Sequence, residues 1–409
     1  MKETRFKQTE IGLIPEDWEV VTISKIAETS SGGTPSRSIN RYYNGNIRWI
    51  TTSELKDSRI YDSIEHITEE AVQNSSAKMF PKGTVLMAMY GATIGKLGIL
   101  EVCSTTNQAC CAIICRDIKN IYLFYYLFFI RKEIILQGCG AGQPNISQNI
   151  VKNINIGLPK EIEQKKIASA LTSIDNLLLS LDKLIEKKRL IKQGAMQELL
   201  TGKKRLPGFA GEWVERRLGE ISKIYRGGSP RPIENYLTTM NDGINWIKIG
   251  DVDKSAKYIY KTQERIKPSG VSSSRYVKSG DFLLSNSMSF GRPYILKTSG
   301  CIHDGWLVIQ DYQQYCDCDF LYYTLSSNYI LQQYKAKAAG SSVLNLNKDI
   351  ASNVIMKYPK DILEQKAIAK VLSCIDKEIE SLEGKKAKYE QIKQGMMQLL
   401  LTGKIRLIS

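Results

Sequence analysis

The 409-residue sequence lacks the features that mark membrane, secreted and zinc-binding proteins. Its longest apolar run, Ile121 to Ile130, is about half of the roughly 20 residues that a membrane-spanning helix needs. The first ten residues, MKETRFKQTE, contain no apolar stretch suited to a signal peptide. The nine cysteines form no C-x-x-C pair, and His66 and His303 are the only histidines. We therefore expect neither a disulfide framework nor a zinc site, and a reducing cytoplasm suits the chain best.

Motifs of catalytic and cofactor-binding sites are missing or incomplete. Residues 91–97, GATIGKL, resemble a phosphate-binding loop, but the loop is one residue short and Leu97 stands where a magnesium-binding Ser or Thr is required. Residues 138–142, GCGAG, are rich in glycine, but no dinucleotide-type helix follows them. The Glu-x-Lys patterns at 163–165 and 364–366 resemble fragments of a nuclease metal site, yet their place at the start of an expected helix favours a capping role. The sequence thus predicts no catalytic residue, no metal site and no cofactor bound by this chain.

The positive charge is spread along the whole chain. The net charge is +15, and 43% of the residues are hydrophobic, enough for sizeable folded cores. Residues 1–156, 160–205, 206–356 and 357–406 carry net charges of +2, +5, +4 and +4. Because no basic tail dominates, the distribution favours a folded body that lies along a polyanion.

The sequence contains an internal duplication. The motif Gly-Gly-Thr-Pro at 32–35 recurs as Gly-Gly-Ser-Pro at 227–230, and the offset grows slowly from 195 to 201 towards the end of the chain. Such growth is typical of small loop insertions in one copy of a duplicated domain. Residues 161–206 and 362–407 are identical at about half of their positions, whereas the parts before them agree only at scattered positions. One scaffold is therefore built twice, with two different surfaces.

The two similar segments have the pattern of long helices. Apolar residues recur at a strict 4-3 spacing, which places one narrow apolar seam on each helix, as in a coiled coil. The seam residues are Ile167, Leu171, Ile174, Leu178, Leu181 and Ile185 in the first segment and Ile368, Leu372, Ile375, Ile379 and Leu382 in the second. A proline precedes each segment, and Thr-Gly-Lys at 201–203 and 402–404 marks the expected helix ends. We expect the two seams to pack together; the alternative is that each seam covers only its own domain.

The divergent parts, which we call the first body (1–157) and the second body (206–357), have a mixed α/β pattern. Short apolar runs at 84–90 and 281–284 predict strands, and 118–136 and 320–334 predict helices. We expect Trp18 and Trp213 to lie in the cores. The predicted fold class is α/β (α+β), with the long helices at 158–205 and 358–409.

Two sets of loops carry candidate DNA-contacting residues. Glycine lets the backbone approach a phosphate closely, and arginine binds phosphate or reads guanine. Amide and hydroxyl side chains suit base edges. The candidates are Gly32, Gly33, Thr34, Arg37, Arg41, Arg48, Lys96, Gln143 and Asn145 in the first body, and Arg226, Gly227, Gly228, Ser229, Arg231, Lys248, Arg292, Ser341, Ser342 and Asn345 in the second. The alternative is that these loops are tight turns that join structural elements.

Two copies of one long motif carry a family resemblance. The stretch Ile-Lys-Gln-Gly-x-Met-Gln-x-Leu-Leu-Thr-Gly-Lys-x-Arg-Leu occurs at 191–206 and again at 392–407. Together with Glu-Gln-Lys at 163–165 and 364–366, it resembles the conserved regions of specificity subunits from type I restriction-modification systems. The Asp-Trp and Glu-Trp openings, each followed by a glycine-pair motif, are similar to the target-recognition domains of that family. The resemblance covers essentially the whole chain.

This resemblance implies a sequence-specific DNA-binding subunit that is not itself an enzyme. Each body would be a target-recognition domain for one half of a bipartite, asymmetric site in double-stranded DNA. The two conserved helices would form an antiparallel coiled coil that sets the spacer between the halves. Two methyltransferase subunits would dock on the chain, and restriction and translocase subunits would join them. S-adenosylmethionine, ATP and Mg²⁺ would be bound by these partners in the cytoplasm of a prokaryote.

Other functions remain open at this point. A DNA-recognition subunit of a fused methyltransferase-nuclease system would carry the same motifs. A non-enzymatic architectural DNA-binding protein would have no reason to diversify its two halves. An enzyme acting alone is disfavoured because the motifs for catalysis are missing.

Overall fold

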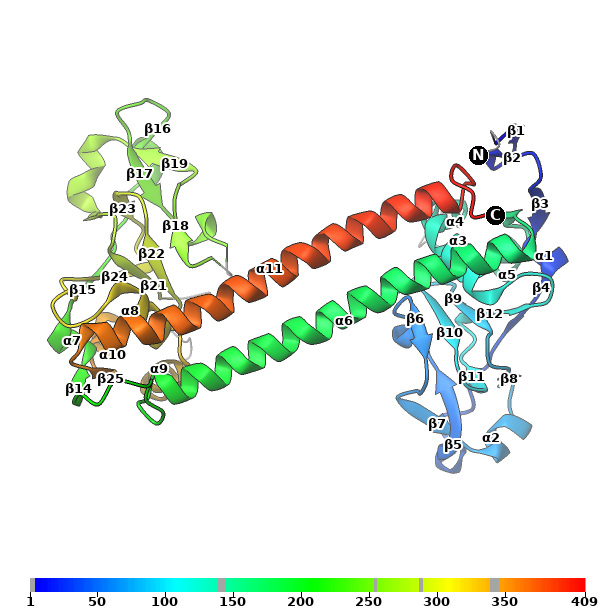
Figure 1. Cartoon of the computed structure of the whole chain (residues 1–409), viewed down its shortest axis with the longest axis horizontal. Coiled ribbons are helices and arrows are strands. Elements are labelled where there is room, and N and C mark those ends of the chain that lie inside the picture. The colour runs from blue at the N-terminus through cyan, green and yellow to red at the C-terminus, as the bar shows by residue number, and fades with distance from the viewer. Residues whose placement is uncertain (1–3, 139–144, 254–255, 287–289, 339–345, 409) are drawn as a thin grey trace. The chain divides into compact units, whose positions relative to one another are not determined.

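The computed structural model describes residues 4–138, 145–253, 256–286, 290–338 and 346–408. The chain divides into two compact units, residues 1–182 with 384–409 and residues 183–383. Each unit contains one body, the first part of one long helix and the last part of the other (Figure 1).

The first body contains two sheets and a layer of helices. Its five-stranded sheet has the order β4 (Ala27–Ser31), β12 (Cys110–Cys115), β9 (Val85–Ala88), β10 (Leu97–Leu100) and β6 (Ser58–Ile60). Its four-stranded sheet has the order β7 (Glu65–Ile67), β5 (Tyr43–Ile50), β11 (Ser104–Thr106) and β8 (Met79–Phe80). Two further antiparallel pairs are β1 (Phe6–Thr9) with β2 (Gly12–Pro15), and β3 (Glu19–Thr22) with β13 (Asn155–Leu158). The helices are α1 (Ile23–Ile26), α2 (Glu69–Gln73), α3 (Asn120–Phe129), α4 (Arg131–Gln137) and α5 (Gln148–Lys152).

The second body repeats the topology of both sheets, with one added edge strand in the second sheet. Its first sheet has the order β15 (Lys223–Arg226), β24 (Trp306–Gln310), β21 (Phe282–Ser285), β22 (Pro293–Leu296) and β18 (Tyr258–Ile259). Its second sheet has the order β16 (Leu237–Thr238), β19 (Glu264–Ile266), β17 (Ile244–Ile247), β23 (Gly300–Ile302) and β20 (Arg275–Val277). Strand β14 (Trp213–Arg217) pairs with β25 (Ile355–Pro359), and the helices are α7 (Leu218–Ile221), α8 (Cys318–Leu325), α9 (Asn328–Ala338) and α10 (Lys348–Ser352).

The parallel strand pairs confirm the duplication. In both bodies the first sheet ends in one parallel pair, β10 with β6 and β22 with β18. The second sheet of each body contains another parallel pair, β5 with β11 and β17 with β23. In these pairs Trp49 lies opposite Thr105, and Trp246 lies opposite Cys301. The same register in two divergent sequences means that the sheet scaffold is shared.

The central strand of each first sheet is buried on both faces. Val85 and Met87 of β9 pack into a core with the helices, whereas Leu86 and Ala88 pack into a second core with the other sheet. Successive strand side chains point to opposite faces, so a strand between two cores must be apolar throughout. This explains why the predicted strand at 84–90 has no polar alternation.

The long helices α6 (Glu161–Leu199) and α11 (Ile362–Leu400) have 39 residues each. At 1.5 Å per residue, such a helix is about 58 Å long. The glycines after them, Gly202 and Gly403, have φ of 70° and 68°, the left-handed conformation that favours glycine at a helix end. The predicted helix ends at Thr-Gly-Lys are therefore confirmed.

Within each unit the two helix segments pair in an antiparallel sense. In the first unit Asp175 and Asp182 of α6 form ion pairs with Lys393 and Lys386 of α11. As the residue number rises in one helix, it falls in the other. In the second unit Lys188 and Lys192 pair with Glu378 and Asp376 in the same descending order.

The seam residues lie on the less exposed side of the helices. Ile167, Leu171, Ile174, Leu181, Ile185, Ile368, Leu372 and Ile379 are buried, and Leu178, Ile375 and Leu382 are half-buried. The starts and ends of the helices are embedded in the bodies: Ile167, Leu171 and Leu400 belong to the first core, and Leu199 and Leu372 to the second.

Two predicted helices are each broken into two. The segment at 118–136 forms α3 and α4, and the segment at 320–334 forms α8 and α9. In the second case the hydroxyl of Ser327 accepts a hydrogen bond from the N–H of Ile330, which caps a new helix. Among the helices described, none is long and apolar enough to span a membrane.

Candidate nucleic-acid interface

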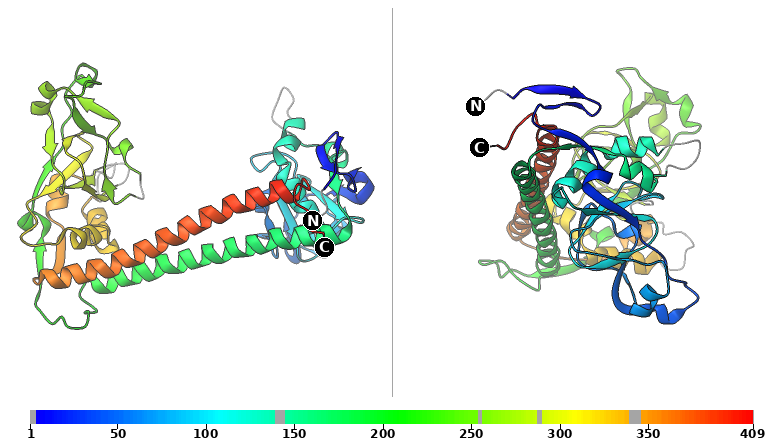
Figure 2. Two further views of the ribbon diagram at one scale, coloured as in Figure 1. Left: turned by 45° about the horizontal axis from the view of Figure 1, so that its top comes forward. Right: turned by 90° about the vertical axis from the view of Figure 1, so that its right-hand side faces the viewer.

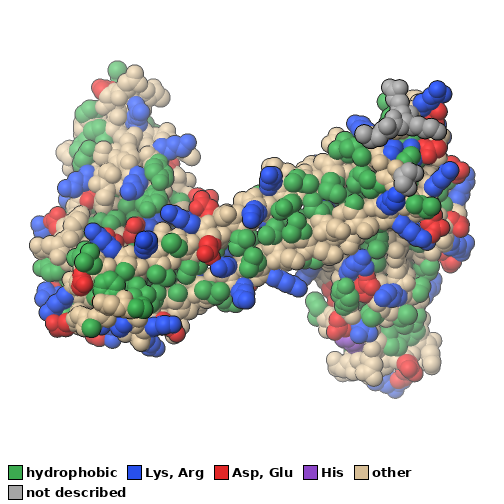
Figure 3. All heavy atoms as spheres, viewed as in Figure 1, with side chains coloured by type: hydrophobic (Ala, Val, Ile, Leu, Met, Phe, Trp, Pro, Cys, Tyr) green, Lys and Arg blue, Asp and Glu red, His purple; other side chains and the backbone are tan. Residues whose placement is uncertain are grey.

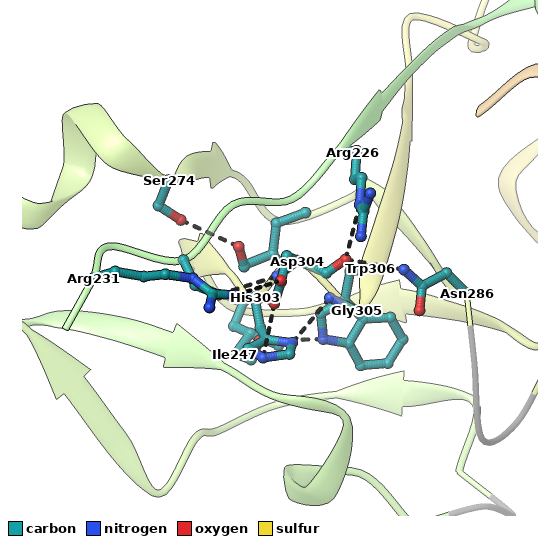
Figure 4. Close-up of polar contacts among 11 residues, drawn as sticks. Arg226, Arg231, Ile247, Ser274, Asn286, His303, Asp304, Gly305 and Trp306 are labelled. Atoms are coloured by element: carbon teal, nitrogen blue, oxygen red, sulfur yellow. Dashed lines mark hydrogen bonds and ion pairs between the residues drawn. The ribbon is translucent and has the colours of Figure 1, made fainter. Parts of the chain in front are cut away.

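The glycine-pair loop of the second body is tied to the loop between β23 and β24 (Figure 4). The Ser229 hydroxyl donates to a carboxylate oxygen of Asp304 at 2.9 Å. Arg231 pairs with the same carboxylate at 3.4 Å, and His303 Nε2 lies 2.9 Å from it. Arg226 Nε donates to the Asp304 carbonyl at 3.2 Å. Three of the predicted DNA-contacting side chains therefore converge on one aspartate that the sequence analysis did not single out.

The corresponding loop of the first body is built from different residues. The Thr34 hydroxyl donates to the amide oxygen of Gln108, which occupies the position of Asp304 in the loop between β11 and β12. Arg37 stands over the rings of Tyr43 and Trp49, with its guanidinium carbon 4.5 and 5.1 Å from the ring centroids. It also forms a two-pronged ion pair with Glu65. The second body differs beside Trp246, the equivalent of Trp49. A cavity of about 730 Å³ lies there, and Arg231 and Pro232 are among the residues that line it.

The glycines of both loops serve close packing inside the protein. A Cβ on Gly32 would collide with the backbone of Thr106, and one on Gly227 with the backbone of His303. The N–H groups of Gly33, Gly227 and Gly228 donate to carbonyl oxygens of the same body at 2.9, 2.8 and 3.1 Å. The sequence predicted that the N–H groups of these glycines are free to bind a phosphate. The N–H groups of these three residues are not free, because each donates to a carbonyl oxygen of the protein. Contacts of the loop side chains with DNA stay a prediction.

The other predicted cations are mostly paired within their own body. The pairs are Arg41 with Glu70, Arg48 with Asp62, Lys96 with Asp57 and Lys248 with Glu264. Arg292 lies 5.9 Å from the ring centroid of Tyr294. Each of the paired side chains would have to exchange a carboxylate for a DNA phosphate in order to bind DNA.

The second set of predicted loops is only partly described. Asn145 is exposed, and its N–H donates to the carbonyl of Gly138 at 3.0 Å. Gln143, Ser341, Ser342 and Asn345 lie outside the described residues.

Sequence reasoning missed a second group of cations beside the glycine-pair loops. Lys78 in the first body and Arg275 in the second are both exposed and occupy equivalent places at the edge of the second sheet. The offset of 197 between their numbers lies within the range of the duplication, so alignment of the two halves could have found them.

A buried carboxylate joins each body to the long helices. In the first unit Glu163, only 1% exposed, forms an ion pair with Arg406 at 2.7 Å and accepts a hydrogen bond from Trp18 Nε1 at 3.1 Å. In the second unit Glu364 does the same with Arg205 at 2.6 Å and with Trp213 Nε1 at 3.3 Å. The predicted position of both glutamates in the first helical turn is confirmed. The arginine partner was not predicted, because Arg406 is 243 positions from Glu163 in the sequence.

Arg406 also brings the end of the chain back to the first body, where both termini lie (Figure 2). It pairs with Asp17 at 2.7 Å, and this hydrogen bond lowers the pKa of that carboxyl. The hydrogen bond to Glu163 raises the pKa of Arg406, so the cation stays charged at every accessible pH. In the second unit Arg205 donates to the carbonyl of Gly211 instead.

A second duplicated set lies further along each helix. The Tyr125 hydroxyl donates to Asp175 at 2.6 Å, and Lys393 forms an ion pair with the same carboxylate at 2.6 Å. In the second unit Tyr323 donates to Asp376 at 2.7 Å, and Lys192 completes the set. Burial raises the pKa of both tyrosines, and the neighbouring carboxylates raise it further, so each hydroxyl remains a donor.

Two features tested in the sequence, a metal-holding cluster and a phosphate-binding loop at 91–97, are not formed by the described residues. The described residues contain no group of three or more His, Cys, Asp or Glu side chains placed to hold a metal ion. The glycine-rich turn at 91–95 joins the antiparallel strands β9 and β10, whereas a phosphate-binding loop would lead into a helix. Lys96 pairs with Asp57 rather than facing a nucleotide site.

Comparison with known proteins gives the family. The family model of the type I restriction modification DNA specificity domain matches twice, at residues 15–192 and 210–391. The chain belongs to this family. It carries two copies of the specificity domain, as the internal duplication requires.

Related sequences agree along the whole chain. The MjaVIII type I restriction enzyme specificity subunit of Methanocaldococcus jannaschii is 28% identical over 99% of this chain and 97% of its own length. The putative MjaX specificity subunit of the same organism is 30% identical over 99% and 97%. A third subunit from that organism, MjaIX, is 33% identical, and this match spans 58% of each chain.

Solved structures share the fold. A chain from a study of complex assembly and conformational transition in a type I restriction-modification system has a TM-score of 0.65 at 18% identity and covers 96% of this chain and 99% of its own. The S subunit of a type I system from M. genitalium has a TM-score of 0.57 at 16% identity, with coverage of 97% and 98%. The α/β bodies and the paired long helices are thus the architecture of this family.

Proposed function

We propose that this chain is the DNA-recognition subunit of a type I restriction-modification enzyme. Each body recognises one half of a bipartite site in double-stranded DNA, and the chain itself catalyses neither methylation nor cleavage. Methyltransferase subunits, and then restriction and translocase subunits, assemble on it and bring S-adenosylmethionine, ATP and Mg²⁺. The assembly works in the cytoplasm of a prokaryote.

The observation that carries this proposal is the contrast between the two copies. The junctions of body and helix use the same residue types in both units, with Glu163 and Arg406 in one and Glu364 and Arg205 in the other. The loops beside the glycine pairs differ in charge and shape, with Gln108 in one body and Asp304 in the other. A site made of two different half-sequences requires two different surfaces held in the same way.

Exposed apolar side chains on the long helices support docking of partner subunits. Leu179 and Leu190 of α6 are 58% and 60% exposed, and Leu363 of α11 is 67% exposed. Figure 3 shows hydrophobic side chains on the surface of both helices. Large apolar side chains that stay in water on a helix are typical of surfaces that a partner covers.

The proposal is tested by sequencing methylated bases in the DNA of cells that produce the full chain together with its methyltransferase subunit. We expect methylation at one bipartite sequence, and none when this chain is omitted. The purified chain alone, with S-adenosylmethionine or with ATP and Mg²⁺, should leave DNA unmodified and uncut. Methylation or cleavage by the chain alone would contradict the proposal.

The role of the helices in spacing is tested by insertion. Four residues inserted after Leu181 add about 6 Å of helix and displace the apolar seam by only about 40°. Because one base pair rises about 3.4 Å, the spacer of the methylated site should grow by one or two base pairs while both half-sequences stay the same. Two inserted residues rotate the seam by about 200° and should damage folding or assembly. An active four-residue variant with the original spacer would show that helix length does not set the spacing.

A further inference from the structure

Two exposed cations flank one tyrosine at the edge of the second body. The guanidinium carbon of Arg275 lies 4.7 Å from the ring centroid of Tyr225, and the Lys348 nitrogen lies 5.7 Å from it. Tyr225 is half-buried and packs against the core between the two sheets. The ring therefore holds two flexible side chains near one place on the surface, with part of their conformational entropy already lost.

These two cations differ from the arginines and lysines chosen from the sequence. Arg231 and Lys248 of the same body have carboxylate partners, Asp304 and Glu264. Within the part of the chain that the structure describes, Arg275 and Lys348 have no carboxylate within 4.0 Å. A cation that is paired only with an aromatic ring keeps its hydrogen-bond donors available for an anion.

The equivalent position on the surface of the first body carries fewer cations. Ser30 of β4 stands where β15 has Tyr225, and the Lys78 nitrogen donates to the Ser30 hydroxyl at 3.3 Å. Gln148, at the start of α5, stands where α10 has Lys348 and donates to the carbonyl of Thr29 at 2.7 Å. One cation in the first body thus corresponds to two in the second.

The glycine pairs bring this place next to the candidate interface. A Cβ on Gly33 would collide with Ser76, two residues before Lys78. A Cβ on Gly228 would lie 3.0 Å from the carbonyl oxygen of Ser273, two residues before Arg275. In both bodies the second glycine allows the loop to pack against the segment that carries the cation.

We infer that Arg275 and Lys348 bind backbone phosphates of the DNA on the second half-site, and that Lys78 makes the single equivalent contact on the first. This inference rests on the proposed function. A guanidinium binds a phosphate through two parallel hydrogen bonds, and an ammonium group binds it as a point charge. The two bodies therefore hold DNA with unequal electrostatic strength.

Salt dependence of binding tests the inference. Fluorescence anisotropy measures the affinity of the full chain for a duplex of random sequence, about 40 base pairs long, at NaCl concentrations from about 50 to about 200 mM. Over this range the salt dependence of the affinity gives the number of phosphate contacts. Each lost phosphate contact makes the slope of log K against log salt less negative by about 0.9. We expect a change of about 0.9 for Lys78→Ala, for Arg275→Ala and for Lys348→Ala, and about 1.8 for the double variant R275A/K348A.

Matched variants separate this contact from general loss of charge. Arg275→Lys and Tyr225→Phe keep the cation and the ring and should keep the wild-type slope. Gln148→Ala and Lys335→Ala, the latter an exposed lysine of α9, should also leave the slope unchanged. Circular dichroism spectra identical to those of the wild type show that the alanine variants are folded.

The outcomes distinguish the two levels of the proposal. If the wild-type chain does not bind the duplex, the proposed function is wrong, and this inference falls with it. If the wild type binds but R275A/K348A keeps its slope, only the inference is wrong. If Arg275→Ala weakens binding to one sequence and leaves the salt slope unchanged, Arg275 reads a base, which also overturns the phosphate assignment.

Discussion

The junctions and the loops of the two halves have diverged to very different degrees. At the junctions, a buried glutamate, an arginine from the end of the other helix and a tryptophan recur as a set. At the loops, Arg37 lies over the ring of Trp49 in the first body, whereas Arg231 forms an ion pair with Asp304 in the second. Duplication has kept the chemistry that fixes a body on the helices, and the surface that the body displays has changed. The comparison separates residues that hold the scaffold from residues on the surface that differs between the two bodies.

The largest expected effect comes from the first junction. In Arg406→Met the carboxylate of Glu163 stays buried without its partner, which costs about 3–5 kcal/mol. Hydrogen exchange should show this loss as faster local opening of the first unit, with the second unit unaffected. Lys404→Met, an equal change in charge at an exposed position two residues away, is the control. Equal exchange in both variants would show that the junction does not stabilise the first body.

The seam gives the next largest effect. Leu171 is fully buried in the first core, and Leu171→Ala should cost about 2–5 kcal/mol through lost burial and the cavity left behind. Leu179, on the same helix and 58% exposed, is the matched site, and Leu179→Ala should change stability by less than about 0.5 kcal/mol. Denaturation with urea, followed by helix content, measures both. Similar losses in the two variants would place Leu171 outside a packed core.

A third prediction compares a partly buried helix pair with an exposed one. Asp175 and Lys393 are 26% and 19% exposed and share Tyr125, so a double-mutant cycle should give a coupling of about 1–2 kcal/mol. Arg189 and Glu383 are 56% and 46% exposed, and their coupling should stay below about 0.5 kcal/mol. Equal couplings would mean that the duplicated tyrosine adds nothing to the helix contact.

The smallest effect is a difference in acid sensitivity between the two loops. Burial acts to raise the pKa of Asp304, but the Ser229 hydrogen bond and the charges of His303 and Arg231 outweigh it, and the pKa is lowered. Because the pKa is lower in the folded state, ionised Asp304 stabilises the loop at pH values above the ordinary aspartate pKa of about 3.9. This stabilisation is lost as the pH falls through the lowered pKa. Gln108, its counterpart, does not titrate.

Nuclear magnetic resonance of backbone amides near residues 229 and 304 should therefore show a loosening as the pH falls below about 4, and the amides near residues 34 and 108 should lack it. Asp304→Asn should remove the difference between the two loops. Loosening of both loops together would assign the acid sensitivity to another group.

The scaffold could be predicted well from the sequence because the duplication presents each of its motifs in two copies. Strict spacing of apolar residues predicted the long helices, and the repeated motifs predicted their ends, as Gly202 and Gly403 confirm. The strand order did not follow from periodicity, because strands buried on both faces, such as β9, have no polar alternation. The break between α8 and α9 depends on one serine hydroxyl, a contact that a continuous apolar pattern hides.

The candidate interface could be predicted only in outline. The glycine pairs were predicted to approach phosphates, whereas in the structure Gly33 packs against Ser76 and Gly228 against Ser273. DNA contact by these loops stays a prediction. Asp304 and Arg275 were not predicted as site residues. Their partners, Ser229 and Tyr225, are distant from them in the sequence, and no short motif contains either pair. A residue whose role depends on a neighbour from another strand gives no signal in a single segment of sequence.

The most direct test of independent bodies on a common scaffold is an exchange of residues 1–157 for the equivalent body of another family member. Methylated bases are sequenced in cells that produce the hybrid chain with its methyltransferase subunit. If each body reads its own half-site, one half of the methylated sequence changes, and the other half and the spacer length stay the same. A change in both halves would contradict the account, because the two bodies would then recognise DNA as one unit.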